Sequence, residues 1–223
     1  MKKNTIFFGI FLLLVLTTYN FNSDKNLINY FFGIKKIEVL GLSYFEKNGL
    51  EEKIEDLKGK NIIFTNSKDL TKIVSKFNFV KGFTIRKKYP REITIIIKEY
   101  KPIGIFTNKT KQSILLEEGK SVQLINENKF MKLPKVNGIN ASKNFFILNE
   151  SLKHTNFDKD SINEFKYYKT NRWDIILKNG KIIKLPSENY ENSLIKFANL
   201  YKKDSFKKFN IFDFRINGQL VVK

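Results

Sequence analysis

The chain has 223 residues, and its 41 Lys and Arg against 22 Asp and Glu give a formal net charge of +19. Hydrophobic residues make up 42 %, enough to build one or two domain cores, which excludes a disordered basic tail. The absence of cysteine and the single histidine exclude disulfide scaffolds, cysteine-ligated zinc, iron–sulfur clusters, thiol catalysis and histidine-rich metal sites.

The first 23 residues predict a membrane anchor. Lys2 and Lys3 precede residues 4–23, which carry no charge and would span about 30 Å as a helix, the thickness of a bilayer core. Small residues that would mark signal-peptide cleavage are missing, which favours an uncleaved anchor over a cleaved signal. We therefore expect residues 1–3 in the cytoplasm, one pass through the inner membrane and a periplasmic bulk.

This topology and the composition both argue against nucleic acid as a partner. Only four of the 41 basic residues are arginine, the residue best matched to phosphates, and lysine-rich chains are typical of compositional bias. The start of an RNA-binding motif at residues 81–83 does not continue.

Five elements are predicted between residues 34 and 102, in the order β-α-α-β-β. Residues 34–41 alternate as a strand, and two helices follow, with apolar stripes over residues 50–57 and 70–77. Residues 79–87 and 92–99 then form two strands. Two helices on one face of a three-stranded sheet would make a small α+β domain.

Residues 103–223 are predicted to be rich in strands. A hairpin is expected around residues 117–120, a turn-rich passage at 133–138 and a helix with a break in 148–165. Asn179-Gly180 between apolar strands indicates a second hairpin. A helix capped by Ser187 and a terminal strand, Ile216 to Lys223, complete this domain.

Both halves carry ordered motifs of a known family. Val39-Leu40-Gly41, Gly59-Lys60-Asn61-Ile62, Arg86 to Pro90 and the segment from Ile93 to Pro102 resemble a POTRA domain, residues 34–102. In the second half, Leu133-Pro134 with Gly138, Arg172-Trp173 with Gly180, and Asp213 with Arg215 occur in the order typical of the FtsQ/DivIB family of bacterial cell division proteins. The predicted fold class is thus α+β: a transmembrane helix, a βααββ POTRA domain and a C-terminal β domain of antiparallel sheet over 103–223.

The resemblance implies a division scaffold rather than an enzyme. FtsQ-like proteins bind single-span partners, FtsB and FtsL, at the septum, with FtsB docking on the C-terminal sheet edge and the preceding helix. Carried onto this chain, the partner-binding residues are as follows: Ile216, Asn217, Gly218, Leu220, Val222, Tyr201 and Phe206. A terminal strand with nothing after it to shield its edge can template a partner strand, although ordinary inward pairing is the competing interpretation.

Catalysis has little support in the sequence, and no cofactor, metal or small-molecule substrate is expected. His154 has no nucleophile motif or second ligand nearby, and the carboxylate pairs Glu51/Glu55 and Glu117/Glu118 lie in solvated positions. Two alternatives remain open: a POTRA-containing transport or outer-membrane assembly factor, and an exported cell-wall hydrolase.

Overall fold

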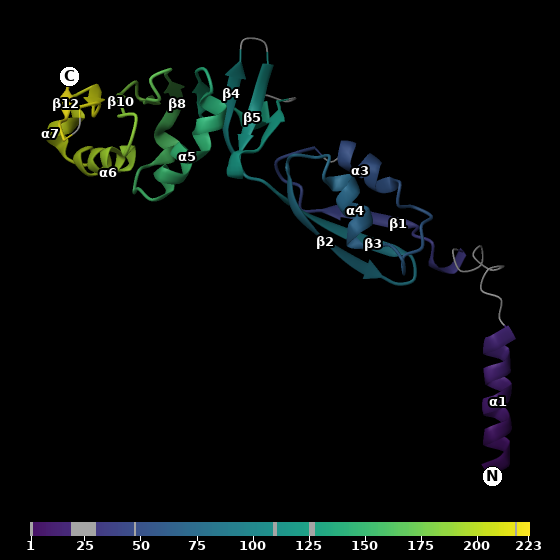
Figure 1. The fold of residues 1–223 in the computed structure, drawn as a ribbon. Coiled ribbons are helices and arrows are strands. Elements are labelled where there is room, and N and C mark those ends of the chain that lie inside the picture. Colours follow the sequence, from purple (N-terminus) through teal and green to yellow (C-terminus); the bar gives the residue numbers. More distant parts are fainter. Residues whose placement is uncertain (1, 19–29, 47, 109–110, 125–127, 217) are drawn as a thin grey trace. The chain divides into compact units, whose positions relative to one another are not determined.

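The computed structural model describes residues 2–18, 30–46, 48–108, 111–124, 128–216 and 218–223 (Figure 1). The chain divides into two compact units, Met1–Lys98 and Glu99–Lys223. Each unit has its own core, so each is described by itself.

The first unit begins with helix α1, Lys2–Thr18. The apolar side chains from Phe7 to Val15 along its middle are exposed, Phe7 by 77 %. Within the described ranges, no helix combines the length and the apolarity needed to cross a membrane. Residues 19–23 of the predicted anchor lie outside the described residues.

The rest of the first unit has the predicted order of elements, which are β1 (Lys36–Leu40), α3 (Asn48–Glu55), α4 (Ser67–Val74), β2 (Val80–Lys88) and β3 (Glu92–Glu99). The strands form a sheet in the order β1-β3-β2, with β1 parallel to β3 and Val39 opposite Ile95. This mixed α+β arrangement leaves β1 and β2 at the sheet edges.

The helical stripes that the sequence predicts form the core of this unit. Leu50, Ile54 and Leu70 are fully buried, as is Ile95 on the central strand. Helix α4 begins with a capping box, because the Asn66 side chain accepts from backbone N–H groups of the first turn while Asp69 accepts from the Asn66 N–H. The cap stabilises the first turn of α4, whereas its buried apolar face packs it into the core.

The second unit is built on a nine-stranded sheet in the order β12-β11-β10-β9-β8-β7-β4-β5-β6. Its strands are β4 (Pro102–Asn108), β5 (Lys111–Leu116), β6 (Ser121–Gln123), β7 (Lys135–Asn137), β8 (Ile162–Tyr167), β9 (Trp173–Leu177), β10 (Ile182–Lys184), β11 (Ile211–Asp213) and β12 (Val221–Val222). The helices are α5 (Ala141–Lys153), α6 (Tyr190–Leu200) and α7 (Asp204–Lys207), with short 3-10 turns at Glu117–Gly119, Asn128–Phe130 and Lys159–Ser161.

Helices α5 and α6 pack on one face of this sheet. Phe145 of α5 and Phe197 of α6 contribute to one buried aromatic cluster with Phe165, Trp173 and Phe212 from the strands. Phe145 meets Phe165 at a ring distance of 4.9 Å, and Phe197 meets Phe212 at the same distance. The sheet face that carries these rings is therefore the core face, and the next residue along each strand faces the other way.

Three strands of this unit differ from the sequence-based expectation. Strand β4 begins at Pro102, the last residue of the expected POTRA domain, and a proline is tolerated there because the first residue of a strand can lack an N–H without losing a ladder hydrogen bond. The predicted turn at 133–138 contains β7, which pairs parallel to both β4 and β8, and β10 pairs parallel to β11. The expectation of an antiparallel sheet is therefore wrong, because the sheet is mixed. Residues 148–165 were expected to form a helix with a break. In the structure their first part belongs to α5 and their last part to strand β8.

Candidate functional site

The C-terminal segment and helix α6 form a shallow groove of about 460 Å³, which we call the C-terminal groove. One wall is formed by residues 214–216 and 218–220, and the other by one side of α6 with the loop before it. The lining residues are Pro186, Ser187, Glu188, Asn189, Asn192, Ser193, Lys196, Leu200, Phe214, Arg215, Ile216, Gly218, Gln219 and Leu220.

Strand β12 is an edge of the nine-stranded sheet, and its hydrogen-bond pattern shows which groups face outward. Ile211 and Lys223 exchange both backbone hydrogen bonds, at 2.9 and 3.1 Å. Along an antiparallel ladder, hydrogen-bonded pairs alternate with pairs that are not hydrogen-bonded. The next residue of β12 to bond β11 is therefore Val221, which lies opposite Asp213. Val222 lies between these pairs, and its backbone N–H and C=O point to the open side of the sheet.

The structure brings part of the predicted partner-binding set together. Ile216, Gly218 and Leu220 line the C-terminal groove, and Ile216 is 56 % exposed. Val222, two residues after Leu220 on β12, packs with Leu220 against the core cluster. Asn217 lies outside the described residues.

Tyr201 and Phe206, the other two predicted residues, do not line the groove. The Tyr201 hydroxyl accepts a hydrogen bond from Asn179 Nδ2 at 2.7 Å, and its ring stacks on Phe197. Phe206, on α7, is half-buried against the same core and contacts Phe209. Both side chains contribute to packing of the unit.

Four other residues that line the groove come from α6 and were not among the predicted partner-binding residues: Asn192, Ser193, Lys196 and Leu200. Asn192, Lys196 and Leu200 follow one another at intervals of four, which places them on one helix face. Asn192 and Lys196 lie on the side of the helix away from the buried Leu194, and this spacing is visible in the sequence. The polar side of the predicted helix was therefore a usable signal.

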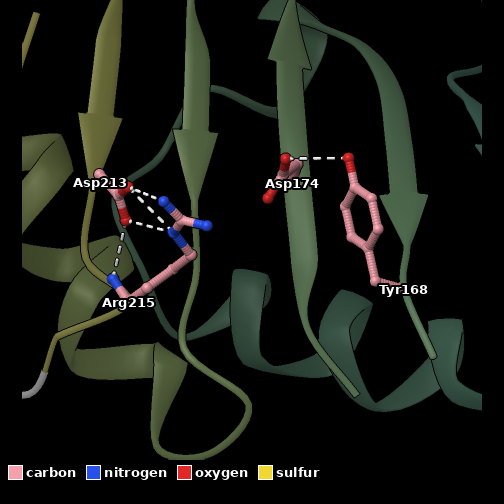
Figure 2. Close-up of polar contacts among 4 residues, drawn as sticks. All are labelled: Tyr168, Asp174, Asp213 and Arg215. Carbon is pink, nitrogen blue, oxygen red and sulfur yellow. Dashed lines mark hydrogen bonds and ion pairs between the residues drawn. The ribbon is translucent and has the colours of Figure 1, made fainter. Parts of the chain in front are cut away.

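Arg215 is positioned beside the groove by Asp213, the last residue of β11 (Figure 2). Arg215 Nε donates to both carboxylate oxygens, at 2.8 and 2.9 Å, and its backbone N–H donates to one of them. These hydrogen bonds hold the pKa of Asp213 below its ordinary value, with smaller contributions from nearby positive charge.

A second polar pair lies on the same open sheet face, where Tyr168 donates to Asp174 Oδ2 at 3.1 Å (Figure 2). Burial raises the pKa of Asp174, although the Tyr168 hydrogen bond and nearby Lys184 act in the opposite direction. Asp174 lies opposite both Lys166 and Lys184 in the ladder, so charges of alternating sign run across the strands. The row continues to Asp213 on β11.

The described part of the chain contains no group of three or more Asp, Glu, His or Cys side chains arranged to hold a metal ion. His154 caps the carboxyl end of α5 and is exposed.

The C-terminal groove offers backbone groups, apolar side chains and an arginine held in place by Asp213, and these features suit the binding of a polypeptide segment.

Comparisons with known proteins agree with the two-unit architecture. A sequence model described as "POTRA domain, FtsQ-type" matches residues 32–100, and one described as "Cell division protein FtsQ/DivIB, C-terminal" matches residues 105–215. Cell division protein FtsQ of Rhizobium radiobacter is 29 % identical over 55 % of this chain and 58 % of its own length. Cell division protein DivIB of Clostridium botulinum, strain Loch Maree, is 26 % identical over 93 % of this chain and 84 % of its own length.

The matches to FtsQ of Rhizobium meliloti, Rhizobium radiobacter and Agrobacterium fabrum span 45, 58 and 38 % of those relatives' lengths. Among solved structures, the major extracytoplasmic domain of DivIB from Geobacillus stearothermophilus aligns with a TM-score of 0.35 and 13 % identity, over 47 % of this chain and 92 % of that one.

Proposed function

The chain belongs to the FtsQ/DivIB family of bacterial cell division proteins, and from this premise we propose that it is a non-enzymatic, membrane-anchored scaffold of the division machinery. Its C-terminal unit binds short single-span division proteins of the FtsB and FtsL type, and its POTRA domain helps to recruit the assembly to the septum. The POTRA match of the FtsQ type favours this role over outer-membrane assembly.

The proposed anchor is residues 4–23, with Lys2 and Lys3 held in the cytoplasm and the two folded units in the periplasm. The exposed apolar side chains along α1 support it, because a run of exposed phenylalanine and leucine is unfavourable in water and favourable in lipid. The inner membrane is then the site of action.

The open edge of β12 is the observation that carries the proposed partner binding. A partner strand added beside Val222 would pair with backbone groups that point away from β11. The C-terminal groove next to this edge would accept side chains of the same partner, with Ile216 as an exposed apolar contact. Backbone pairing supplies affinity in this binding mode and the groove supplies specificity.

Two proline substitutions test this model, because they remove neighbouring N–H groups that point in opposite directions. Val222→Pro removes an outward donor and places a ring on the open side, so we expect at least a tenfold loss of binding to an FtsB-like partner in detergent, with the fold retained. Val221→Pro removes a donor to β11, so we expect it to lower the stability of the C-terminal unit. Unchanged partner affinity in Val222→Pro would refute docking at this edge.

A further inference from the structure

A second hollow in the C-terminal unit, which we call the Asn149 pocket, has a volume of about 210 Å³. It lies between α5, the 3-10 turn at Lys159–Ser161 and the starts of β4 and β8. Its lining residues are Lys101, Pro102, Ile103, Glu117, Lys132, Leu133, Pro134, Asn149, Leu152, Lys153, Lys159, Asp160, Ile162 and Phe165. None of them lines the C-terminal groove.

Asn149 presents an unpartnered hydrogen-bond donor in this pocket. Its side chain is only 7 % exposed, and Nδ2 has no hydrogen-bond partner among the described residues. A buried amide N–H without an acceptor opposes folding, so native proteins rarely leave one without a reason such as a bound water, ion or ligand. The missing partner must be an acceptor, since Nδ2 can only donate.

The charged side chains around Asn149 favour a negatively charged acceptor. Four lysines and two carboxylates line the pocket, which leaves an excess of two positive charges. Lys153 is paired with Glu150 at 2.5 Å, whereas Lys159 Nζ donates a long hydrogen bond of 3.4 Å to the Asn149 backbone oxygen. Burial lowers the pKa of Lys159, and repulsion from Lys153 and Lys101 acts in the same direction, whereas Glu150 opposes it. An anion beside Lys159 would offset this burial and repulsion.

The other lining residues restrict the kind of anion. Leu152, Ile162 and Phe165 are buried apolar side chains, and the small volume suits a group about the size of one amino acid. Glu117 and Asp160 in the lining would repel a doubly charged phosphate more than a singly charged carboxylate. An anionic head on a small apolar body fits both features.

We propose that the Asn149 pocket binds a carboxylate carried on a small apolar group, as found at an apolar C-terminal residue of a peptide. Asn149 Nδ2 donates to the carboxylate, Lys159 supplies the neighbouring positive charge, and the apolar wall contacts the side chain. This site is separate from the edge of β12, so it would receive a different ligand or a different part of a partner.

The test titrates the isotope-labelled full chain in detergent with N-acetyl-leucine, N-acetyl-leucinamide and inorganic phosphate, while NMR follows the Asn149 side-chain amide. We expect saturable shifts with N-acetyl-leucine and at least tenfold weaker binding of the other two probes. If N-acetyl-leucinamide bound as tightly as N-acetyl-leucine, the pocket would recognise only the apolar group. If phosphate bound equally tightly, the pocket would be an anion site without selectivity for a carboxylate. The absence of any saturable shift would mean that only water satisfies Asn149. Each of these results overturns the proposal.

Two variants separate the ligand role of these residues from a structural one. Lys159→Gln is expected to weaken N-acetyl-leucine binding at least tenfold, whereas Lys143→Gln, an exposed change on the same helix as Asn149, should leave it unchanged. Asn149→Leu should abolish binding and raise the urea midpoint of the unliganded protein, because it removes an unpaired buried donor. A lower midpoint for Asn149→Leu would show that the fold itself uses the amide, and would refute the assignment.

Discussion

Gly138, directly after β7, provides the sharpest test of how the C-terminal sheet is held together. Its φ is +124°, and a Cβ at this position would lie 2.1 Å from the backbone oxygen of Tyr167 at the end of β8. Gly138→Ala therefore has two effects on the free energy of unfolding. An alanine at this positive φ costs about 1–3 kcal/mol, and the clash that forces β7 and β8 apart costs roughly 1–3 kcal/mol in addition. We expect these two contributions to lower the free energy of unfolding by about 2–6 kcal/mol in total.

Gly180→Ala is the matched control. Gly180 has a φ of +83°, but a Cβ there meets nothing within 4 Å, so only the backbone cost of about 1–2 kcal/mol applies. Urea unfolding followed by Trp173 fluorescence measures both variants in the C-terminal unit, because this tryptophan is the only one in the chain and is 2 % exposed. Equal destabilisation by the two substitutions would refute the argument from close approach of β7 and β8.

Three further substitutions test local electrostatics and capping. Asn66→Ala removes the capping box of α4 and should cost about 1 kcal/mol, measured by faster hydrogen exchange of the α4 amides. Asp213→Asn weakens the hydrogen bonds to the partly exposed Arg215 and should cost about 1 kcal/mol in urea unfolding at pH 7. The pKa of Asp213 is lowered in the fold, so this difference should be present above the ordinary Asp pKa and disappear as the pH falls through the folded value. Asp174→Asn has the opposite sign: because burial raises the pKa of Asp174, the variant should be more stable than the native protein at pH 7, and this advantage should vanish in acid.

Each of these expectations has a clear contrary outcome. Unchanged exchange in α4 would mean that packing alone holds this helix. A pH-independent effect of Asp213→Asn would attribute its cost to shape rather than charge. A loss of stability in Asp174→Asn at pH 7 would show that the charged partners around Asp174 outweigh its burial.

The fold could be predicted best where the apolar residues of one short segment recur with a clear helical or strand periodicity. The helical stripe from Leu50 to Leu57 and the alternating Ile93, Ile95 and Ile97 are all buried as expected. Strands β7 and β10 have three residues each, too few to show a period, and only the Asn179-Gly180 turn made the second of them recognisable. Parallel pairing of β7 with both neighbours depends on distant segments and leaves no local signal.

The candidate site could be predicted in part for a similar reason. The C-terminal position of Ile216 and Leu220 is visible in the chain, and both line the groove. Tyr201 continues the apolar stripe of α6, and an apolar stripe faces the core, where Tyr201 stacks on Phe197. The residues of a helix that remain available to a partner are those on its polar side, such as Lys196, so choosing them requires knowing which face is already buried.

The charge row across the open sheet face bears on how a partner strand could be recognised. Lys166, Asp174, Lys184 and Asp213 alternate in sign from β8 to β11, so each charge has an opposite neighbour within the sheet. The row ends at Val221 on β12, an exposed apolar side chain, while the adjacent Leu220 and Val222 face the core. A strand added at this edge would meet apolar side chains on both faces and unpaired backbone groups between them. Recognition there would depend on backbone pairing and apolar contact, and the net charge of +19 would contribute little to it.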